Sequence, residues 1–252
     1  MGNGEPLVRT QVNNSIGRLT LSDPATRNAL SKAMSDQIAE AVATALEAGA
    51  LVLILDATPP VFCSGGSLDG LLASNQRSAD AYAGHFALAE APVPTIAAIA
   101  APAIGAGVSL PLVCDVVLAG ESARFDPRFL DVGIHPGGGH LWRLSQRIGE
   151  QGAAAMVLCG DQLTGAEAAA TGLAWRCVPD HNLESLVTQF AERVASRSPA
   201  LVQRTKESLQ AIRSAPDLRT AHSIELAAQE WSVEQPEFRE TVEKIRRSLR
   251  AR

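Results

Sequence analysis

The stretch that most constrains the fold is Ala101–Asp115, which reads APAIGAGVSLPLVCD. It predicts a tight loop over Ala101–Gly105 that opens into a short helix ending near Leu112. This helix has almost no polar face, which is typical of a helix inside a core. Gly105 has no Cβ, so another backbone or a ligand can approach it closely. Because a helix start carries unpaired N–H groups and a positive dipole end, this stretch can hold a negatively charged oxygen.

A second glycine-bearing segment supplies a partner for the first. Leu51–Asp56 is a continuous apolar run, the pattern of a strand covered on both faces. After a proline turn comes the loop Phe62–Leu68, which contains Gly65 and Gly66. Another buried strand, Pro94–Ile99, precedes the first stretch. Two loops that each follow a buried strand can direct two backbone N–H groups at one oxygen.

Five segments match the motifs of one family in order and spacing. They are DPATRNALS (Asp23–Ser31), VFCSGGSL (Val61–Leu68), AIGAGVSLPLVCDVVLAG (Ala103–Gly120), FLDVGIHPGGG (Phe129–Gly139) and LTGAEAAATGLAWRCVP (Leu163–Pro179). The chain resembles the enoyl-CoA hydratase/isomerase, or crotonase, family over nearly its whole length. The resemblance implies an α/β crotonase-like (ClpP/crotonase) fold with a repeated ββα spiral core over residues 1–195. A C-terminal helical oligomerisation region over residues 196–252 would follow it.

Length and composition agree with a large globular domain carrying a helical appendage. The chain has 252 residues, 46% hydrophobic and 4% aromatic, so Ala, Leu, Val and Ile must build the core. Its net charge of −5 argues against nucleic acid as a partner. No apolar run reaches the length of a membrane span and the N-terminus lacks a signal-peptide pattern, so we expect a cytoplasmic protein without a membrane partner. The four cysteines are widely spaced in apolar surroundings, which predicts reduced, buried thiols and no metal site.

The remaining hydrophobic pattern predicts strands near the N-terminus and helices toward the C-terminus. A turn at Asn13-Asn14 should join the first two strands, Ser31 should cap a helix running to about Ala48, and Asp126 should cap a short helix that starts at Pro127. Strands are expected at Val8–Val12, Ile16–Leu21, Val116–Ala119 and Leu173–Val178. Helices are expected at Leu68–Ala73, Ala79–Glu90, His140–Ile148, Gln151–Leu158, Gly165–Thr171, Leu183–Arg197, Leu201–Arg213, Leu218–Glu230 and Pro236–Arg247, with a polar join at Ser74–Ser78.

The resemblance also implies a substrate and a site. The substrate would be an acyl-CoA thioester, with CoA as part of the substrate and no separate cofactor, and the backbone N–H groups of Gly66 and Ala106 would stabilise its enolate. Arg27 would contact a CoA phosphate, and the carbonyls of Ser64 and Leu68 would meet the adenine. Further binding positions are Ala29, Gly65, Ser67, Ile104, Gly105, Ser109, Phe129, Val132 and Gly137. The helical tail would form homotrimers or dimers of trimers.

The acid–base positions depart from the family pattern. Hydratases of the family carry two glutamates, and the matching residues here are Ser109 and Phe129. A third position, acidic in some relatives, is Gly137. Serine is a poor general base at neutral pH and phenylalanine carries no proton, so hydration by two glutamates is not expected.

Other residues are therefore candidates for proton transfer. His135 ranks first because its intrinsic pKa suits the task. Asp131 ranks second, although its spacing from Arg128 favours a surface ion pair. His85 is expected to be an ordinary, partly buried helix histidine, and His140 to begin the next helix.

These observations predict an enzyme of the enoyl-CoA hydratase/isomerase type, a lyase or isomerase of fatty acid metabolism. Two alternatives remain open. One is a hydrolase or decarboxylase that uses His135 or Asp131, including a thioester hydrolase in which Ser109 pairs with His135. The other is an acyl-CoA binding protein without catalysis.

Overall fold

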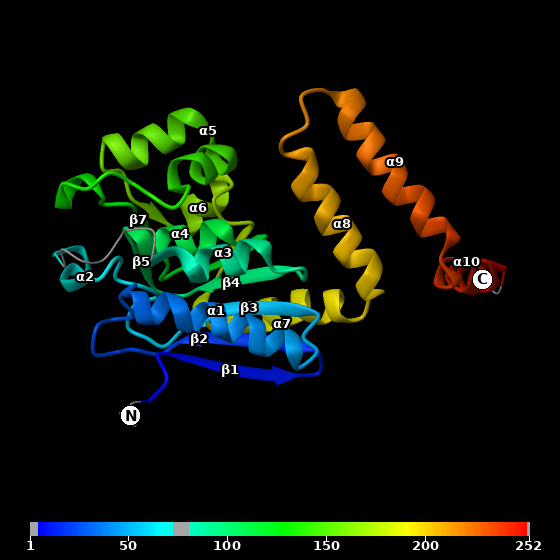
Figure 1. Ribbon diagram of the computed structural model, residues 1–252, viewed down its shortest axis with the longest axis horizontal. Helices are drawn as coiled ribbons and strands as arrows, with labels where there is room; N and C mark the ends of the chain where they lie inside the picture. The colour runs from blue at the N-terminus through cyan, green and yellow to red at the C-terminus, as the bar shows by residue number, and fades with distance from the viewer. Residues whose placement is uncertain (1–4, 73–80, 251–252) are drawn as a thin grey trace. The chain divides into compact units, whose positions relative to one another are not determined.

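The computed structural model describes residues 5–72 and 81–250. The chain divides into two compact units, Met1–Val194 and Ala195–Arg252. The first unit contains two β-sheets with covering helices, and the described part of the second consists of helices (Figure 1).

The main sheet has six strands, and its order β1-β2-β3-β4-β6-β9 follows the chain apart from the strands of a second sheet. The strands are β1 (Val8–Asn13), β2 (Ile16–Leu21), β3 (Val52–Ala57), β4 (Thr95–Ile99), β6 (Val116–Gly120) and β9 (Arg176–Val178). β1 and β2 form an antiparallel hairpin with Val8 opposite Leu21, and all later neighbours pair in parallel. The hairpin turn lies one residue later than predicted, because Asn14 and Ser15 carry the positive φ angles.

Both faces of this sheet are covered, which explains the continuous apolar runs of its central strands. On β3, Val52 and Ile54 belong to a core cluster shared with helix α7 (Asp180–Ala195). Leu53 and Leu55 point to the opposite face and join the larger core. The prediction that Leu51–Asp56 is a strand buried on both faces is confirmed.

Helix α1 (Lys32–Glu47) begins as predicted. The Ser31 hydroxyl oxygen accepts a hydrogen bond from the Met34 N–H at 3.1 Å, which satisfies one unpaired donor of the first turn. α2 (Leu68–Leu72) and α3 (Ala83–Glu90) follow β3. The start of the helix predicted at Ala79, the end of the one at Ala73 and the join at Ser74–Ser78 lie outside the described residues.

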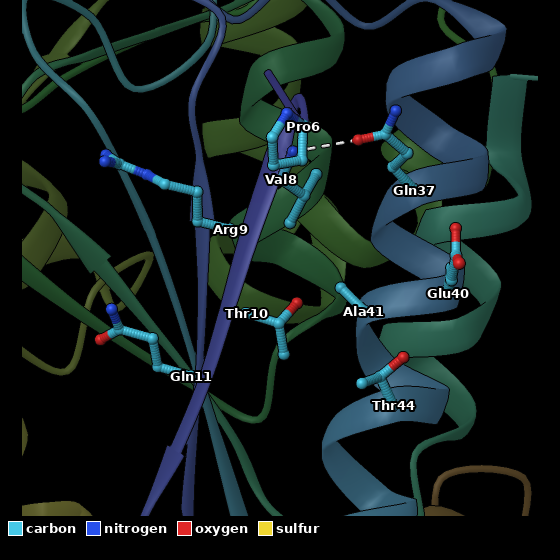
Figure 2. A pocket seen from close by; sticks show the side chains of 9 residues that line it. All are labelled: Pro6, Val8, Arg9, Thr10, Gln11, Gln37, Glu40, Ala41 and Thr44. Carbon is cyan, nitrogen blue, oxygen red and sulfur yellow. Dashed lines mark hydrogen bonds between the residues drawn. The ribbon is translucent and has the colours of Figure 1, made fainter. Parts of the chain in front are cut away.

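The surface between β1 and α1 is hollowed into a groove of about 650 Å³ (Figure 2). Gln37 reaches across it, and its side-chain oxygen accepts from the Leu7 and Val8 N–H groups at 2.7 and 3.2 Å. None of the predicted site residues appears among the residues that line it.

A second, three-stranded sheet was not predicted. It orders β5 (Pro102–Ile104), β7 (Arg124–Asp126) and β8 (Leu163–Thr164), whose two or three residues are too few to show a hydrophobic period. Part of the predicted loop Ala101–Gly105 is therefore strand. The prediction that Asp126 caps a helix is wrong: Asp126 ends β7 opposite Ile104, and its carboxylate pairs with Arg128. The helical turn that follows is the 3-10 segment η2 (Leu130–Val132).

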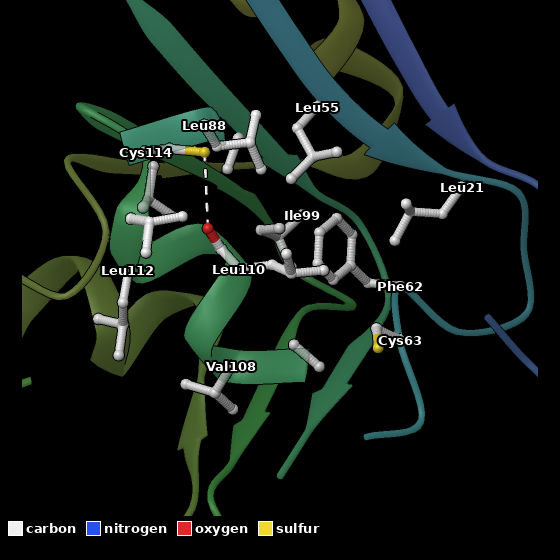
Figure 3. Close-up of a cluster of buried hydrophobic side chains, with 14 of the residues drawn as sticks. Leu21, Leu55, Phe62, Cys63, Leu88, Ile99, Val108, Leu110, Leu112 and Cys114 are labelled. Carbon is white, nitrogen blue, oxygen red and sulfur yellow. Dashed lines mark hydrogen bonds between the residues drawn. The ribbon is translucent and has the colours of Figure 1, made fainter. Parts of the chain in front are cut away.

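Helix α4 (Ala106–Val113) lies inside the larger core (Figure 3). Every residue from Gly107 to Val113 is buried, and Phe62, Leu88 and Ile99 surround the helix from other elements. The absence of a polar face in the sequence of α4 reflects this position.

Helix α5 (His140–Leu158) contains a break at Gly149, where φ is 76°. The break separates the two helices predicted for this region. α6 (Gly165–Thr171) matches its predicted bounds and starts with a reciprocal capping box between Thr164 and Glu167. All four cysteines are free, but Cys159 is exposed, so the prediction of uniformly buried thiols is wrong there.

The second unit contains α8 (Pro199–Ile212), α9 (Leu218–Glu234) and α10 (Pro236–Arg250). The Arg204 guanidinium lies over the Trp231 ring, 5.9 Å from its centre, and joins α8 to α9. Within residues 5–72 and 81–250, no helix combines the length and apolar character needed to cross a membrane.

Candidate active site

The first glycine loop follows β3 and is held by backbone hydrogen bonds on two sides. The Leu30 N–H donates to the Gly65 carbonyl at 2.7 Å, and the Ile104 N–H donates to the Cys63 carbonyl at 2.9 Å. Gly65 has a φ of +102°, and a Cβ there would lie 3.0 Å from the Ile104 carbonyl oxygen. Glycine suits this position on both counts. The loop that carries Gly66 is therefore clamped between the chain before α1 and strand β5.

The second glycine position lies at the junction of β5 and α4. Gly105 has a φ of 53° and donates its N–H to the Asp126 carbonyl at 2.7 Å. A Cβ on Gly107 would lie 2.6 Å from the Cys63 carbonyl oxygen, so the first turn of α4 packs directly on the first loop. A Cβ on Gly105 would lie 3.9 Å from the Gly65 Cα. The two predicted loops are thus in contact.

The N–H groups of Gly66 and Ala106 form no hydrogen bond within the part of the chain that the structure describes. Ala106 is the first residue of α4, where an N–H has no partner inside the helix. Both residues are partly exposed. Two unpaired donors on adjoining loops are the kind of group that holds a developing negative charge.

Several of the residues predicted to bind the substrate flank the first loop. Near the first loop, the Ser64 N–H donates to the Arg27 carbonyl at 3.1 Å, and the Ser67 N–H donates to the Leu30 carbonyl at 2.9 Å. Arg27 and Leu68 are exposed, while Ala29 is partly buried. The backbone of the Arg27–Leu30 segment therefore runs beside the loop that contains Gly66.

The predicted acid–base residues lie at the surface. Asp131 is exposed on η2, and Arg128 pairs with Asp126 instead. His135 is exposed, and its Nδ1 lies 2.7 Å from the Pro136 carbonyl oxygen. The Ser109–His135 pair, left open as an alternative by the sequence, is not formed: Ser109 contacts His140 instead.

Two other histidines occupy the interior beside α4. The Ser109 hydroxyl oxygen lies 2.9 Å from His140 Nδ1, and the Phe129 ring meets the His140 ring edge-on with centroids 4.8 Å apart. His85, on α3, makes a similar edge contact with Tyr82 at 5.4 Å. His85, Ser109 and His140 are each at most 2% exposed. We call these three residues the histidine cluster.

The histidine cluster has unused hydrogen-bonding capacity. Both ring nitrogens of His85 and the Nε2 of His140 lack a partner among the described residues. Burial lowers the pKa of His140 to about 4. Burial also lowers the pKa of His85 to about 4. The nearby Ala106 carbonyl opposes this and raises the pKa, although its contact with His85 does not meet hydrogen-bond geometry. The charges of Arg143 and His140 lower the pKa further. Both rings are therefore neutral at pH 7.

The sequence did not predict this cluster. His85 was expected to be an ordinary helix residue and His140 merely to begin a helix, which it does. A Cβ on Gly138 would lie 2.4 Å from the Tyr82 ring, and one on Gly137 would lie 2.3 Å from the Tyr82 hydroxyl. The glycine run before α5 therefore lets the chain pack closely on Tyr82, one turn before His85. A contact of this kind has no fixed spacing in the sequence from which it could be predicted.

The chain is similar to known proteins over nearly its whole length. The family model for enoyl-CoA hydratase/isomerase matches residues 11–247. The Mycobacterium tuberculosis protein named probable enoyl-CoA hydratase EchA14 is 32% identical over 240 residues, which cover 92% of this chain and 94% of that protein.

Solved structures agree with the sequence match. An enoyl-CoA hydratase from Mycobacterium smegmatis superposes with a TM-score of 0.90 at 25% identity, covering 97% of each chain. A Thermobifida fusca structure solved in complex with CoA gives 0.82 at 26% identity, covering 90% of this chain and 93% of the other. The predicted crotonase fold is confirmed, and the chain belongs to the enoyl-CoA hydratase/isomerase family.

Proposed function

We propose that this protein binds acyl-CoA thioesters and stabilises a thioester enolate with the N–H groups of Gly66 and Ala106. The observation that carries the proposal is the pair of unpaired N–H groups on two loops in contact. The complex of the Thermobifida fusca relative with CoA supports a CoA thioester as the ligand.

The chemistry follows from where charge develops. When a bond beside the thioester carbonyl forms or breaks, negative charge grows on the carbonyl oxygen. Donors already fixed in position meet that charge without reorganising, and one such donor lowers the barrier by roughly 3 kcal/mol. Gly66 is held by its clamped loop, while Ala106 adds the positive end of the α4 dipole.

A proline at position 106 tests this proposal directly. Ala106 is the first residue of α4, where proline fits a helix but carries no N–H. We expect Ala106→Pro to lower turnover of a CoA thioester about 100-fold, because one oxyanion donor is lost. Binding of free CoA should change less than threefold. Conversion is followed by mass spectrometry on crotonyl-, acetoacetyl-, malonyl- and butyryl-CoA.

Leu218→Pro provides the matched control. Leu218 is the first residue of α9, is 84% exposed and follows an extended cap residue, Asp217. This variant should keep wild-type turnover. If Ala106→Pro also keeps wild-type turnover while folded, or if the wild type binds none of the four thioesters, the proposal fails.

Thioester hydrolysis is a second candidate, favoured by the 2.9 Å contact between Ser109 and His140. In this reaction the Ser109 oxygen would attack the thioester carbonyl while His140 takes its proton, and the C–S bond would break so that CoA leaves as the thiol with that proton. Water would then hydrolyse the acyl-serine ester and free Ser109. Release of free CoA from butyryl-CoA, lost in Ser109→Ala, would support hydrolysis over chemistry that leaves the thioester intact.

Self-association through α10 is also proposed, with a homotrimer as the expected form. Four exposed apolar residues of α10 recur at intervals of three and four residues and so share one face. They are Phe238, Val242, Ile245 and Leu249. Native mass spectrometry should show a trimer or hexamer that Ile245→Asp dissociates, and a monomeric wild type would refute the proposal.

A further inference from the structure

The family resemblance does not explain why His85, Ser109 and His140 are buried together in the histidine cluster. Among the described residues, three buried ring nitrogens have no partner that meets hydrogen-bond geometry, two on His85 and one on His140, although the Ala106 carbonyl lies near His85. Leaving a buried polar atom unpaired is costly, so several of them together mark a place that a polar ligand or ordered water would satisfy.

The cluster lies next to the predicted thioester oxygen. Ser109 is three residues after Ala106 on α4, so it lies slightly less than one helical turn further on, or roughly 4.5 Å along the axis. The Ala106 carbonyl is also close enough to His85 to affect its protonation. With the thioester oxygen at the Ala106 N–H and the acyl group running toward Ser109, a substituent two bonds beyond the thioester carbonyl carbon would reach the cluster.

The charge of this region favours an anionic substituent. The positions at which the family carries acids hold Ser109, Phe129 and Gly137, so no carboxylate there repels an anion. Arg143, on the first turns of α5, acts electrostatically on His85. Each neutral imidazole offers one N–H donor, and if Ser109 donates to His140 Nδ1, the His140 proton resides on Nε2.

We propose that His85 and His140, with Ser109 as the positioning residue, bind a carboxylate carried on Cα of the acyl group, and that the substrates are α-carboxyacyl-CoA thioesters of the malonyl type. This inference rests on the proposed enolate function. It names the substrate class of the same site.

The reaction that fits this substrate needs no general base. The bond between Cα and the carboxylate carbon breaks, and its electron pair forms the enolate held by Gly66 and Ala106. The carboxylate leaves as CO2, and Cα takes up one proton from solvent. The products are the shortened acyl-CoA and CO2, so atoms and charge balance without another reactant. A site that lacks the two glutamates can form an enolate in this way, because no C–H proton has to be removed.

Two ligands of similar size separate carboxylate recognition from general acyl binding. Malonyl-CoA carries the carboxylate, and butyryl-CoA ends in a methyl group. We expect the wild type to release CO2 from malonyl-CoA. We expect His85→Leu and His140→Phe to weaken malonyl-CoA binding about 10–100-fold, the effect of losing a hydrogen bond to a charged group, while butyryl-CoA binding changes less than threefold. Calorimetry measures the binding, and mass spectrometry identifies the products.

The control is His181→Phe at an exposed histidine on α7. It should leave both affinities and CO2 release at wild-type values. Equal loss of affinity for both ligands in the cluster variants would indicate a general disturbance of acyl binding and overturn the carboxylate assignment. Hydration of crotonyl-CoA with malonyl-CoA untouched, or release of free CoA from malonyl-CoA, would overturn the inference but leave the oxyanion hole in place. Failure of the wild type to bind any CoA thioester would instead refute the proposed function.

Discussion

The candidate site has two halves that are built differently. The proposed oxyanion half consists of the backbone N–H groups of Gly66 and Ala106, on loops held by backbone hydrogen bonds. The proposed acyl half consists of the side chains of the histidine cluster, which come from α3, α4 and α5.

This difference explains why one half follows the family pattern and the other does not. A backbone donor depends on chain path rather than on side-chain identity, so Ala106 can serve as long as α4 begins there. The chemistry of a side-chain site changes with a single substitution. Ser109 and Phe129 illustrate this, because they stand where hydratases of the family carry glutamates. Under the proposed function, the same fold can therefore keep the oxyanion donors while the side chains that decide the rest of the chemistry differ.

The largest effect is expected where the backbone half is disturbed. Gly65→Ala would place a Cβ 3.0 Å from the Ile104 carbonyl at a φ of +102°. We expect the loop to shift and turnover to fall about 100-fold, as for loss of one oxyanion donor. Steady-state kinetics on the substrate that the wild type converts would measure this.

Gly49→Ala is the matched control for that variant. Gly49 also has a positive φ, +83°, but an added Cβ would meet nothing within 4 Å. This variant should lose about 1 kcal/mol of stability from backbone strain and no activity. Equal activity losses in the two variants would show that strain alone, and not the oxyanion loop, is responsible.

An intermediate effect is expected on the pH dependence of stability. In the unfolded chain a histidine binds a proton below about pH 6.5. Folded His85 and His140, with pKa values of about 4, do not bind one until the pH is much lower. The unfolded state therefore holds more protons between pH 6.5 and 4, and the free energy of unfolding falls as the pH falls through this window. The loss is about 1 kcal/mol per histidine from pH 6.5 to 5.5.

Urea unfolding at several pH values would check this sign. The double variant His85→Leu/His140→Phe should show a shallower slope, and His181→Phe should keep the wild-type slope. A slope unchanged in the double variant would mean that the cluster is not buried and neutral in the folded protein.

The smallest effect is expected from a side chain within the backbone half. The Ser67 hydroxyl oxygen accepts from the Gly70 N–H at 3.3 Å at the start of α2. Ser67→Ala should cost about 1 kcal/mol or less of stability and change turnover less than threefold. If Ser67→Ala lost as much activity as Gly65→Ala, the claim that the oxyanion half depends on backbone rather than side-chain groups would be wrong.

Local patterns predicted much of the fold. The Ser31 cap, the strand at Leu51–Asp56 and the buried helix α4 were all readable, because each depends on residues close together in the sequence. The second sheet was not, because its strands are too short to show a period. Asp126 was misread because a capping pattern and a strand end look alike without the partner strand that pairs with it.

By itself the sequence determined the family, the crotonase fold and the glycines that the two loops require. Those features depend on backbone geometry, which glycine and proline positions and apolar runs express locally. Only the tertiary structure brought His140 to Ser109 and His85 to the start of α4, and left His135 and Asp131 at the surface. The physical reason is that burial and side-chain contact arise from packing between elements distant in the chain, which no local spacing encodes.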